Sequence, residues 1–257
     1  MKNNLITIIV ATFNADSCLE NLIESIISQD ANYEFILIDG GSKDKTIEII
    51  KKYQSYINYW ISESDKGIYD AWNKGIAKAT GDWIMFLGAD DYLKSNALKK
   101  YYNFLNVHPR IEDLLFLSSK REMIDLKGNL IRTTGYSWEW PLFKKFMTVS
   151  HPGALHSSRL FEKYGMYNID YKISGDYELL LRPRENLNAA FMADVTVIMS
   201  EGGTSDSIKA ITEYFKATTQ TGGSSKASAS INAIIVVLKF IVKKSLRKIG
   251  LNVYLKR

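Results

Sequence analysis

The sequence Gly-Asp-Trp-Ile-Met-Phe-Leu-Gly-Ala-Asp-Asp occupies residues 81–91. Its apolar run from Trp83 to Leu87 is bounded by turn residues, as is typical of a central strand in an α/β sheet. Two carboxylates, Asp90 and Asp91, follow at the end of this strand. Ligands of open α/β sheets bind beyond the carboxyl ends of the strands, where paired carboxylates suit Mg²⁺ or Mn²⁺. The alternative is a solvated turn in which Asp91 or Ser95 caps the next helix.

The segments before this strand alternate between short apolar strands and amphipathic helices. This alternation predicts a parallel sheet with right-handed crossovers, a nucleotide-binding type of half-domain. The second half is less regular, with a hairpin turn expected at 127–129 and an aromatic-rich loop at 136–148. Strands are expected at 5–11, 33–38, 59–62, 113–119 and 189–199. Helices are expected at 17–28, 43–53, 68–79, 98–107, 157–164, 175–181 and 204–219.

The composition is that of a folded soluble protein, with 46% hydrophobic and 24% charged residues in a chain of 257. The formal net charge is +5, and residues 239–257 contain seven Lys or Arg and no acid. A single cysteine, Cys18, excludes an internal disulfide and fits a reducing cytosol. No signal segment precedes the first strand, so we expect a cytoplasmic protein.

The C-terminal tail has its own pattern. From Ile231 to Ile249 apolar residues form one helical stripe, and Lys239, Lys243 and Arg247 recur on another side. The apolar run is too short to span a bilayer, so we expect an interfacial helix on anionic lipid, at the cytoplasmic face of the inner membrane. The alternative is a helix packed on the main domain or on a dimer partner. The expected organisation is a domain over 1–220, with halves 1–110 and 111–220, a flexible linker over 221–230 and a basic amphipathic helix over 231–257.

Two further motifs place polar groups near the sheet edge. Asp39 ends a predicted strand and is followed by two glycines, so its carboxylate can accept hydrogen bonds from a base or ribose, or can cap a turn. The segment 65–67 opens a helix on which Asp70, Asn73 and Lys74 recur at helical spacing. This helix start can host phosphate, or the polar side chains can form an ordinary solvated face.

The second half contributes an acid and a histidine. Asp176 opens a helix that continues with apolar residues, so it either caps that helix or takes a proton from an attacking hydroxyl. His151 precedes a short predicted strand near the same edge. It is either a structural histidine or a contact to an acceptor or a phosphate.

Taken together, these motifs resemble those of the family 2 glycosyltransferases of the GT-A fold, an inverting group that builds bacterial surface polysaccharides. The resemblance covers residues 5–215 and implies an α/β, Rossmann-like fold with a mainly parallel central sheet, and a nucleotide-diphosphate sugar donor, namely a UDP-sugar. The motifs occur in the family order: Thr12-Phe13-Asn14, Asp39-Gly40-Gly41-Ser42, the block from Asp65 to Gly75, the segment from Gly81 to Asp91, and Gly175-Asp176-Tyr177.

The resemblance also implies roles in donor binding. Thr12 and Asn14 would line the base pocket, and Asp39 would contact the uracil or the ribose. Asp65 would help to hold the nucleotide, with Lys74 near the phosphates.

The remaining implied roles concern metal and catalysis. Asp90 and Asp91 would touch the ribose and a Mg²⁺ or Mn²⁺ ion that neutralises the diphosphate. Asp176 would be the catalytic base. Family members often carry Asp-x-Asp-Asp, and Gly88 stands at the first position here, which leaves open which aspartate binds metal.

The implied reaction is addition of one hexose or N-acetylhexosamine, because the Gln-x-x-Arg-Trp element of processive synthases and transmembrane spans are absent from the sequence. The acceptor would be a glycan or lipid-linked precursor of lipopolysaccharide, capsule or another envelope polysaccharide. A nucleotidyltransferase is a weaker interpretation, since no glycine-rich basic loop follows the first strand. The alternative outside the enzymes is a non-catalytic protein of the same fold that binds sugar nucleotides or serves as a membrane scaffold. Nucleic-acid binding is not expected, because the basic excess lies beside an apolar stripe.

Overall fold

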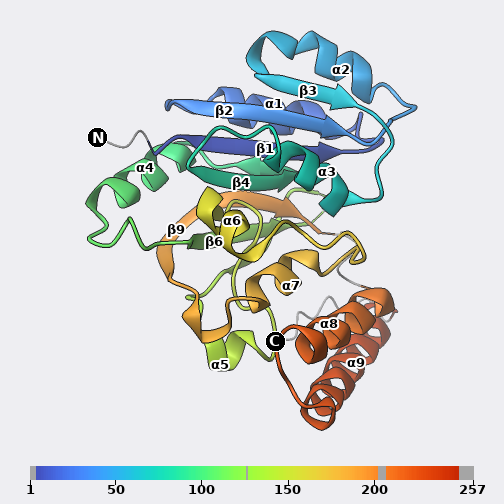
Figure 1. Cartoon of the computed structure of the whole chain (residues 1–257). Helices are drawn as coiled ribbons and strands as arrows, with labels where there is room; N and C mark the ends of the chain where they lie inside the picture. The colour runs from blue at the N-terminus through green and yellow to red at the C-terminus, as the bar shows by residue number, and fades with distance from the viewer. Residues whose placement is uncertain (1–3, 126, 202–206, 249–257) are drawn as a thin grey trace.

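The computed structural model describes residues 4–125, 127–201 and 207–248 (Figure 1). Within these residues, nine strands form one mixed sheet in the order β3-β2-β1-β4-β8-β6-β9-β5, with β7 paired to β6. Helices lie on both faces of the sheet, and two helices project from it at the C-terminal end of the chain. The fold is therefore α/β, as predicted.

The N-terminal half is a parallel sheet because short βα units return the chain to a neighbouring strand in the same direction. Its central strand β1 (Ile6–Thr12) is buried along its whole length, as a continuous β-branched run predicts. β2 (Tyr33–Asp39) and β4 (Trp83–Gly88) pair with β1 on either side, and β3 (Tyr59–Ser62) forms the edge. The helical segments of this half are α1 (Leu19–Ile27), α2 (Thr46–Lys52), η1 (Gln54–Tyr56) and α3 (Ile68–Ile76).

The two faces of this sheet bury separate apolar clusters. Ile8 lies in the cluster formed with α1 and α4 (Ala97–Val107), and Ile9 lies in the cluster formed with α3. Helix α3 approaches β1 so closely at Gly75 that a Cβ atom there would collide with Ile9. The glycine therefore fixes the position of α3, whose first residues border the candidate site.

The second half makes the sheet mixed. β8 (Leu155–Ser157) is antiparallel to both β4 and β6 (Phe116–Ile124), whereas β6 is parallel to β9 (Ala189–Ser200). The predicted mainly parallel sheet thus describes the first four strands and the β6–β9 pair only. The other elements are β5 (Asp91–Leu93), β7 (Leu130–Thr134), α5 (Trp140–Phe143), α6 (Ser158–Tyr164), α7 (Gly175–Leu181) and η2 (Arg184–Asn186).

Two local predictions require correction. Asp91 does not cap the next helix, because it begins β5, which pairs with β9. The strand expected at 113–119 begins at Phe116 and continues to Ile124, because its second half is covered by β7 and β9 although its residues are polar. The predicted turn at 127–129 is confirmed, with Gly128 at φ 83°.

The C-terminal helices form a pair beside α7. Helix α8 (Ile208–Gln220) packs on α7, and α9 (Lys226–Lys248) packs on α8 (Figure 1). Residues 226–230, predicted as linker, already belong to α9, because Ser and Ala continue a helix readily and Ala229 is buried. Residues 204–206 and 249–257 of the predicted helices lie outside the described residues. No helix in the described part of the chain is long and apolar enough to cross a bilayer.

Candidate functional site

The carboxyl ends of β1 and β2 meet the loop before α3 at one edge of the sheet. A Cβ atom at Gly40 would lie 2.6 Å from Oδ2 of Asp65 and 3.3 Å from the ring of Phe13. Only a glycine at this position allows the three segments to approach so closely. The structure thus brings together the first three motifs that the sequence suggested.

Asp39 has no exposed surface, and both of its carboxylate oxygens are engaged within the protein. It accepts hydrogen bonds from the N–H groups of Gly41 (3.0 Å) and Ser42 (2.9 Å), and from the hydroxyls of Ser42 and Ser62, the latter at 2.6 Å. The capped-turn interpretation therefore describes Asp39, which shapes the loop that borders the site. Its contact with a base or ribose stays a prediction.

The end of β1 offers a hydroxyl and an aromatic ring. The Oγ1 atom of Thr12 is buried and makes no hydrogen bond to any described residue. Asn14 adopts a left-handed φ of 47°, and its Oδ1 accepts from the N–H of Lys43 at 2.9 Å. Phe13, to which the sequence analysis gave no role, is 62% exposed beside Gly40. Phe13 thus adds an exposed aromatic ring to the polar residues at the end of β1.

Lys74 stabilises the loop before α3 rather than pointing at an open phosphate site. Its Nζ donates to the carbonyl of Ser64 (3.1 Å) and pairs with Glu63 (2.9 Å). Asp65 accepts from the N–H of Gly67 at 2.8 Å, so both predicted residues define the shape of this loop. The contact of Lys74 with phosphate stays a prediction.

Asp90 and Asp91 converge on Gly88 at the end of β4. A Cβ atom at Gly88 would lie 3.1 Å from Oδ1 of Asp90 and 3.4 Å from Oδ2 of Asp91, so a side chain at this position would need the Asp90 carboxylate to shift slightly. Asp91 is buried and accepts from the N–H of Gly88 at 2.9 Å, whereas Asp90 is exposed. Burial, and then the charge of Asp90, raise the pKa of Asp91 to about 7.

This carboxylate pair is the candidate metal site. Among the described residues, no group of three or more acidic, His or Cys side chains gathers at one point. Two carboxylates nevertheless fit Mg²⁺ or Mn²⁺, which take one or two protein oxygens and complete their shell with phosphate and water. Burial and the nearby charge of Asp90 both disfavour the ionised form of Asp91, and a bound cation would favour that form.

Asp176 lies at the start of α7, partly buried against α3. Its Oδ1 accepts from the N–H of Tyr177 (2.8 Å) and lies 3.1 Å from the hydroxyl of Tyr69. A Cβ atom at Gly175 would be 2.8 Å from the Tyr69 ring, so the glycine allows this contact. Burial raises the pKa of Asp176 above its usual value, and the hydrogen bonds from Tyr177 and Tyr69 oppose this shift.

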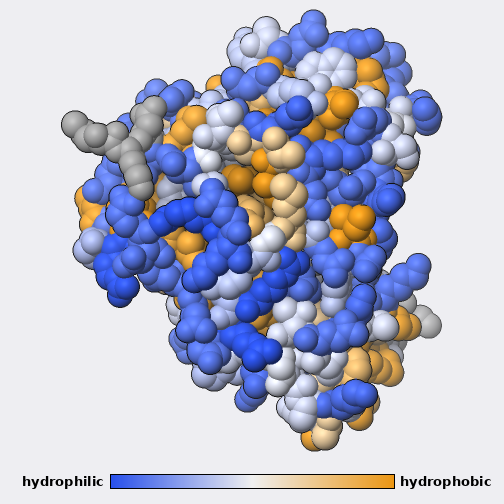
Figure 2. Space-filling model, viewed as in Figure 1, coloured by the Kyte–Doolittle hydropathy of each residue, from blue (hydrophilic) through white to orange (hydrophobic). Residues whose placement is uncertain are grey.

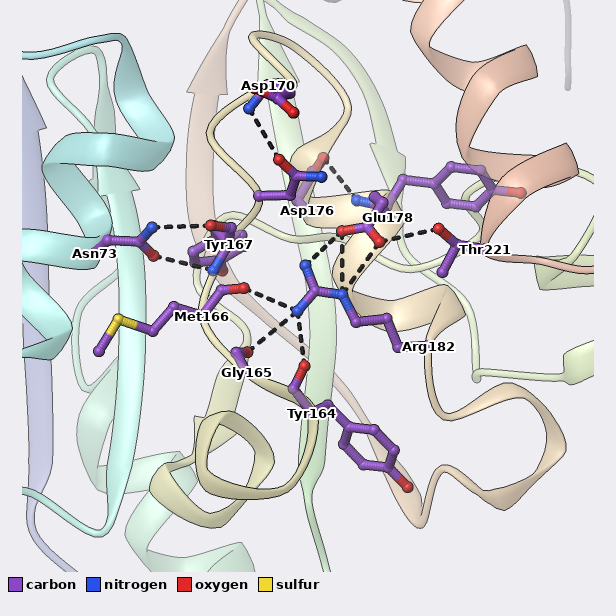
Figure 3. A network of polar contacts seen from close by, with 12 residues as sticks. Asn73, Tyr164, Gly165, Met166, Tyr167, Asp170, Asp176, Glu178, Arg182 and Thr221 are labelled. Atoms are coloured by element: carbon purple, nitrogen blue, oxygen red, sulfur yellow. Dashed lines mark hydrogen bonds and ion pairs between the residues drawn. The ribbon is translucent and has the colours of Figure 1, made fainter.

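A polar network anchors α7 below this carboxylate (Figure 3). Arg182 binds both carboxylate oxygens of Glu178 and the carbonyls of Tyr164 (2.7 Å) and Met166 (2.8 Å). Thr221, which precedes α9, donates to Glu178 at 3.0 Å. Because its charges are almost enclosed, this network holds α7 in one position relative to the preceding loop.

The loop before α7 is tied in turn to α3. The side-chain amide of Asn73 donates to the carbonyl of Tyr167 at 2.9 Å and accepts from its N–H at 3.0 Å (Figure 3). Asn73 was interpreted from the sequence only as part of a polar helix face. Its role here is to join the two halves of the domain beside Asp176.

His151 is buried, and its contacts lie inside the protein. Its Nε2 lies 3.0 Å from the hydroxyl of Tyr167, and its ring stacks on Trp72. Burial, with a smaller contribution from the charge of Arg121, lowers the pKa of His151 to about 3, so the ring is neutral. The structural interpretation of this histidine therefore holds.

Arg121 is the site residue that the sequence did not reveal. It lies on β6 opposite Thr134 of β7, and its Nε donates to the Thr134 hydroxyl at 3.3 Å. Its positive charge opposes the burial that raises the pKa values of Asp91 and Asp176, and it adds to the burial that lowers the pKa of His151. The predicted strand ended at residue 119, and Arg121 was therefore not assigned to the sheet. A predicted strand that continued beyond residue 119 would have placed Arg121 in the sheet.

Comparison with known proteins identifies the family of the chain. The model of the family described as "Glycosyl transferase family 2" matches residues 7–163. A PGL/p-HBAD biosynthesis glycosyltransferase of Mycobacterium bovis is 30% identical over 223 residues, covering 81% of this chain and 82% of that protein. An uncharacterized glycosyltransferase of Haemophilus influenzae is 35% identical over 136 residues, covering 51% of this chain and 53% of that protein.

Solved structures share the fold. TarS 1–349 of S. aureus superimposes with a TM-score of 0.67 at 17% identity, covering 89% of this chain and 69% of that one, whereas this chain spans 41% of the longer TarS chain. The mannosyltransferase PcManGT of Pyrobaculum calidifontis, in complex with GDP-Man and Mn²⁺, gives a TM-score of 0.61 at 16% identity, with coverages of 89% and 68%.

The fold and its acidic sheet edge thus define a glycosyltransferase of the GT-A class. The chain belongs to glycosyl transferase family 2.

Proposed function

We propose that this protein is an inverting glycosyltransferase that moves one sugar from a UDP-sugar to an acceptor hydroxyl. The observation that carries the proposal is the position of Asp176, a partly buried carboxylate bonded to Tyr69 near the charge of Arg121. The same charge also opposes the raised pKa of Asp91 of the acidic pair, which supports placing the base and the acidic pair in one site.

The proposed step is a single displacement. An acceptor hydroxyl attacks the anomeric carbon from the face opposite the diphosphate, and Asp176 takes the hydroxyl proton as the new C–O bond forms. The bond to the diphosphate breaks, and the leaving group keeps the electron pair, so the configuration inverts. A raised pKa makes Asp176 a stronger base, and the N–H of Tyr177 together with the Tyr69 hydroxyl fixes the orientation of the carboxylate.

Asp90 and Asp91 are the residues that would hold a divalent cation. When bound, Mg²⁺ or Mn²⁺ supplies positive charge that neutralises the diphosphate leaving group. The PcManGT complex, which contains GDP-Man and Mn²⁺, supports a metal role for this fold. The protein would hold the diphosphate close to Gly88, where the absence of a side chain leaves room for close approach.

The proposed donor is a UDP-hexose or UDP-N-acetylhexosamine. TarS structures with UDP and with UDP-GlcNAc support this assignment. In the proposed pocket, Thr12 would offer its buried hydroxyl, Phe13 would lie against the base, and Asn14, Asp39, Asp65 and Lys74 would shape the surrounding loops.

The proposed acceptor is a lipid-linked or glycan precursor of an envelope polysaccharide, such as lipopolysaccharide or capsule. The mycobacterial relative, named for PGL/p-HBAD biosynthesis, supports an envelope pathway. The enzyme would work as a peripheral protein at the cytoplasmic face of the inner membrane.

Thermal unfolding with a panel of nucleotide diphosphates tests the donor assignment. We expect UDP to raise the unfolding temperature in the presence of Mn²⁺ or Mg²⁺ and to do so less in EDTA, because a ligand of the folded state alone stabilises it. GDP and ADP serve as controls. Absence of a shift with every nucleotide, in folded protein, would contradict the proposal.

Replacing Arg121 with glutamine is expected to move the acid limb of the kcat–pH profile to higher pH. Asp176 acts as a base only when ionised, so activity rises as pH increases through its pKa. The charge of Arg121 lowers the pKa of Asp176, so its removal shifts this rise in activity to higher pH. The measurement is kcat across about pH 5 to 8.5, within which most enzyme bases titrate.

Arg110→Gln is the matched control for this variant, because Arg110 is exposed and pairs with Asp113 on the surface. Its profile should equal that of the wild type. An Arg121→Gln profile with an unchanged acid limb would show that Arg121 does not act on the base.

A further inference from the structure

Helix α9 carries apolar residues on two opposite faces. Its inner face, toward α8, includes the buried Ala229 and the partly buried Val236 and Phe240. At 3.6 residues per turn these three positions lie on one side of the helix. The inner face therefore accounts for the attachment of α9 to the protein.

The second face, which we call the outer stripe, is exposed. At 3.6 residues per turn it lies opposite the inner face and extends for about 17 Å along the helix. Figure 2 shows apolar side chains gathered where Figure 1 places α9. The outer stripe consists of six residues that are 46% to 60% exposed: Ile231, Ile234, Ile235, Leu238, Ile241 and Val242.

The charge of the surrounding chain indicates what covers this stripe. After Glu213 the sequence contains no acidic residue, and residues 214–257 carry nine Lys or Arg. The preceding part of the chain carries the other 24 Lys and Arg and all 28 Asp and Glu. The apolar stripe thus lies in the one strongly basic segment of an otherwise slightly acidic protein. An apolar stripe within a basic segment matches an anionic bilayer surface.

We propose that the outer stripe of α9 docks the protein on an anionic lipid bilayer, with the helix lying in the interface. The inference rests on the proposed function only for the idea that the membrane supplies the acceptor. Helix α9 packs on α8, and α8 packs on α7, which carries Asp176. Docking would therefore hold the candidate base close to an acceptor carried by the bilayer.

The test is co-sedimentation of the full chain with vesicles of phosphatidylcholine alone or with about 30% phosphatidylglycerol, a composition that gives an anionic surface. We expect the wild type to sediment with the anionic vesicles much more than with the neutral ones. Leu238→Asp should lower partitioning by about tenfold or more, because it places a negative charge in the face that would enter the bilayer. Failure of the wild type to bind anionic vesicles would overturn the proposal.

Val107→Asp is the matched control. Val107 is an apolar residue, 79% exposed, on the distant helix α4, so this variant adds the same charge without changing the stripe. It should sediment like the wild type. Equal loss in both variants, or none in Leu238→Asp, would contradict docking through the outer stripe.

Two solution measurements separate the remaining explanations. Analytical ultracentrifugation without lipid should show the same mass for wild type and Leu238→Asp; a dimer that Leu238→Asp dissociates would instead assign the stripe to a second copy of the chain. UDP affinity without vesicles should be equal in both proteins, which also confirms that the variant is folded. If the wild type did not bind UDP, the donor assignment would be refuted, whereas the proposal of vesicle docking would not be affected.

Discussion

The Asp176→Asn variant is expected to lower kcat by about 10²- to 10⁴-fold, the usual contribution of a general base. Asparagine has nearly the same shape, and its amide oxygen can still accept from the Tyr177 N–H and the Tyr69 hydroxyl. Only the capacity to take a proton is lost, so UDP affinity should remain within about threefold of wild type. Turnover is measured with a UDP-sugar and binding by calorimetry.

Asp170→Asn is the control for this variant. Asp170 lies exposed in the loop that leads into α7, so the substitution changes a nearby charge without touching the base. Its kcat should match that of the wild type. Unchanged turnover in Asp176→Asn would remove Asp176 from the catalytic role.

The Asp91→Ala variant is expected to weaken metal-dependent UDP binding by about tenfold or more, because it removes one of two carboxylates at the candidate metal site. The variant should also lose the difference between UDP stabilisation with Mn²⁺ and with EDTA. Asp91 is buried and its pKa is raised, so its removal also deletes an unfavourable charge. Without metal, the loss of this charge should therefore not lower the stability of the variant below that of the wild type. Calorimetric titration of UDP with and without Mn²⁺ measures the effect.

Asp82→Ala provides the comparison, since Asp82 is an exposed aspartate that precedes β4, at the end of the strand remote from Asp90 and Asp91. Its UDP affinity should be unchanged with either metal or EDTA. Equal metal dependence in wild type and Asp91→Ala would exclude Asp91 as a metal ligand.

The first half of the fold could be predicted because its strands are continuous apolar runs with helical periodicity between them. β1, β2 and β4 are buried strands that each end in a polar motif, so parallel pairing alone brings these motifs to one edge. The position of Asp176 could be suggested only by family resemblance, since no local pattern separates a helix-capping acid from a base.

The details that the sequence left open depend on contacts distant in sequence. Asp39 is satisfied by Ser62, 23 positions along the chain, and Lys74 by Glu63 and Ser64. Arg121 reaches the site because β7 and β9 extend β6 beyond its apolar part. Hydrogen-bond partners of this kind are set by tertiary packing, which hydrophobic periodicity does not report.

The most direct test of the central claim is the anomeric configuration of the sugar first released from an α-linked UDP-sugar, followed by proton NMR before mutarotation. Water can replace the unidentified acceptor in this slow reaction. The proposed mechanism predicts release of UDP together with the β-anomer, and loss of both signals in Asp176→Asn. Release of the α-anomer would contradict inversion, and no release from any sugar nucleotide would favour a binding protein that lacks catalysis.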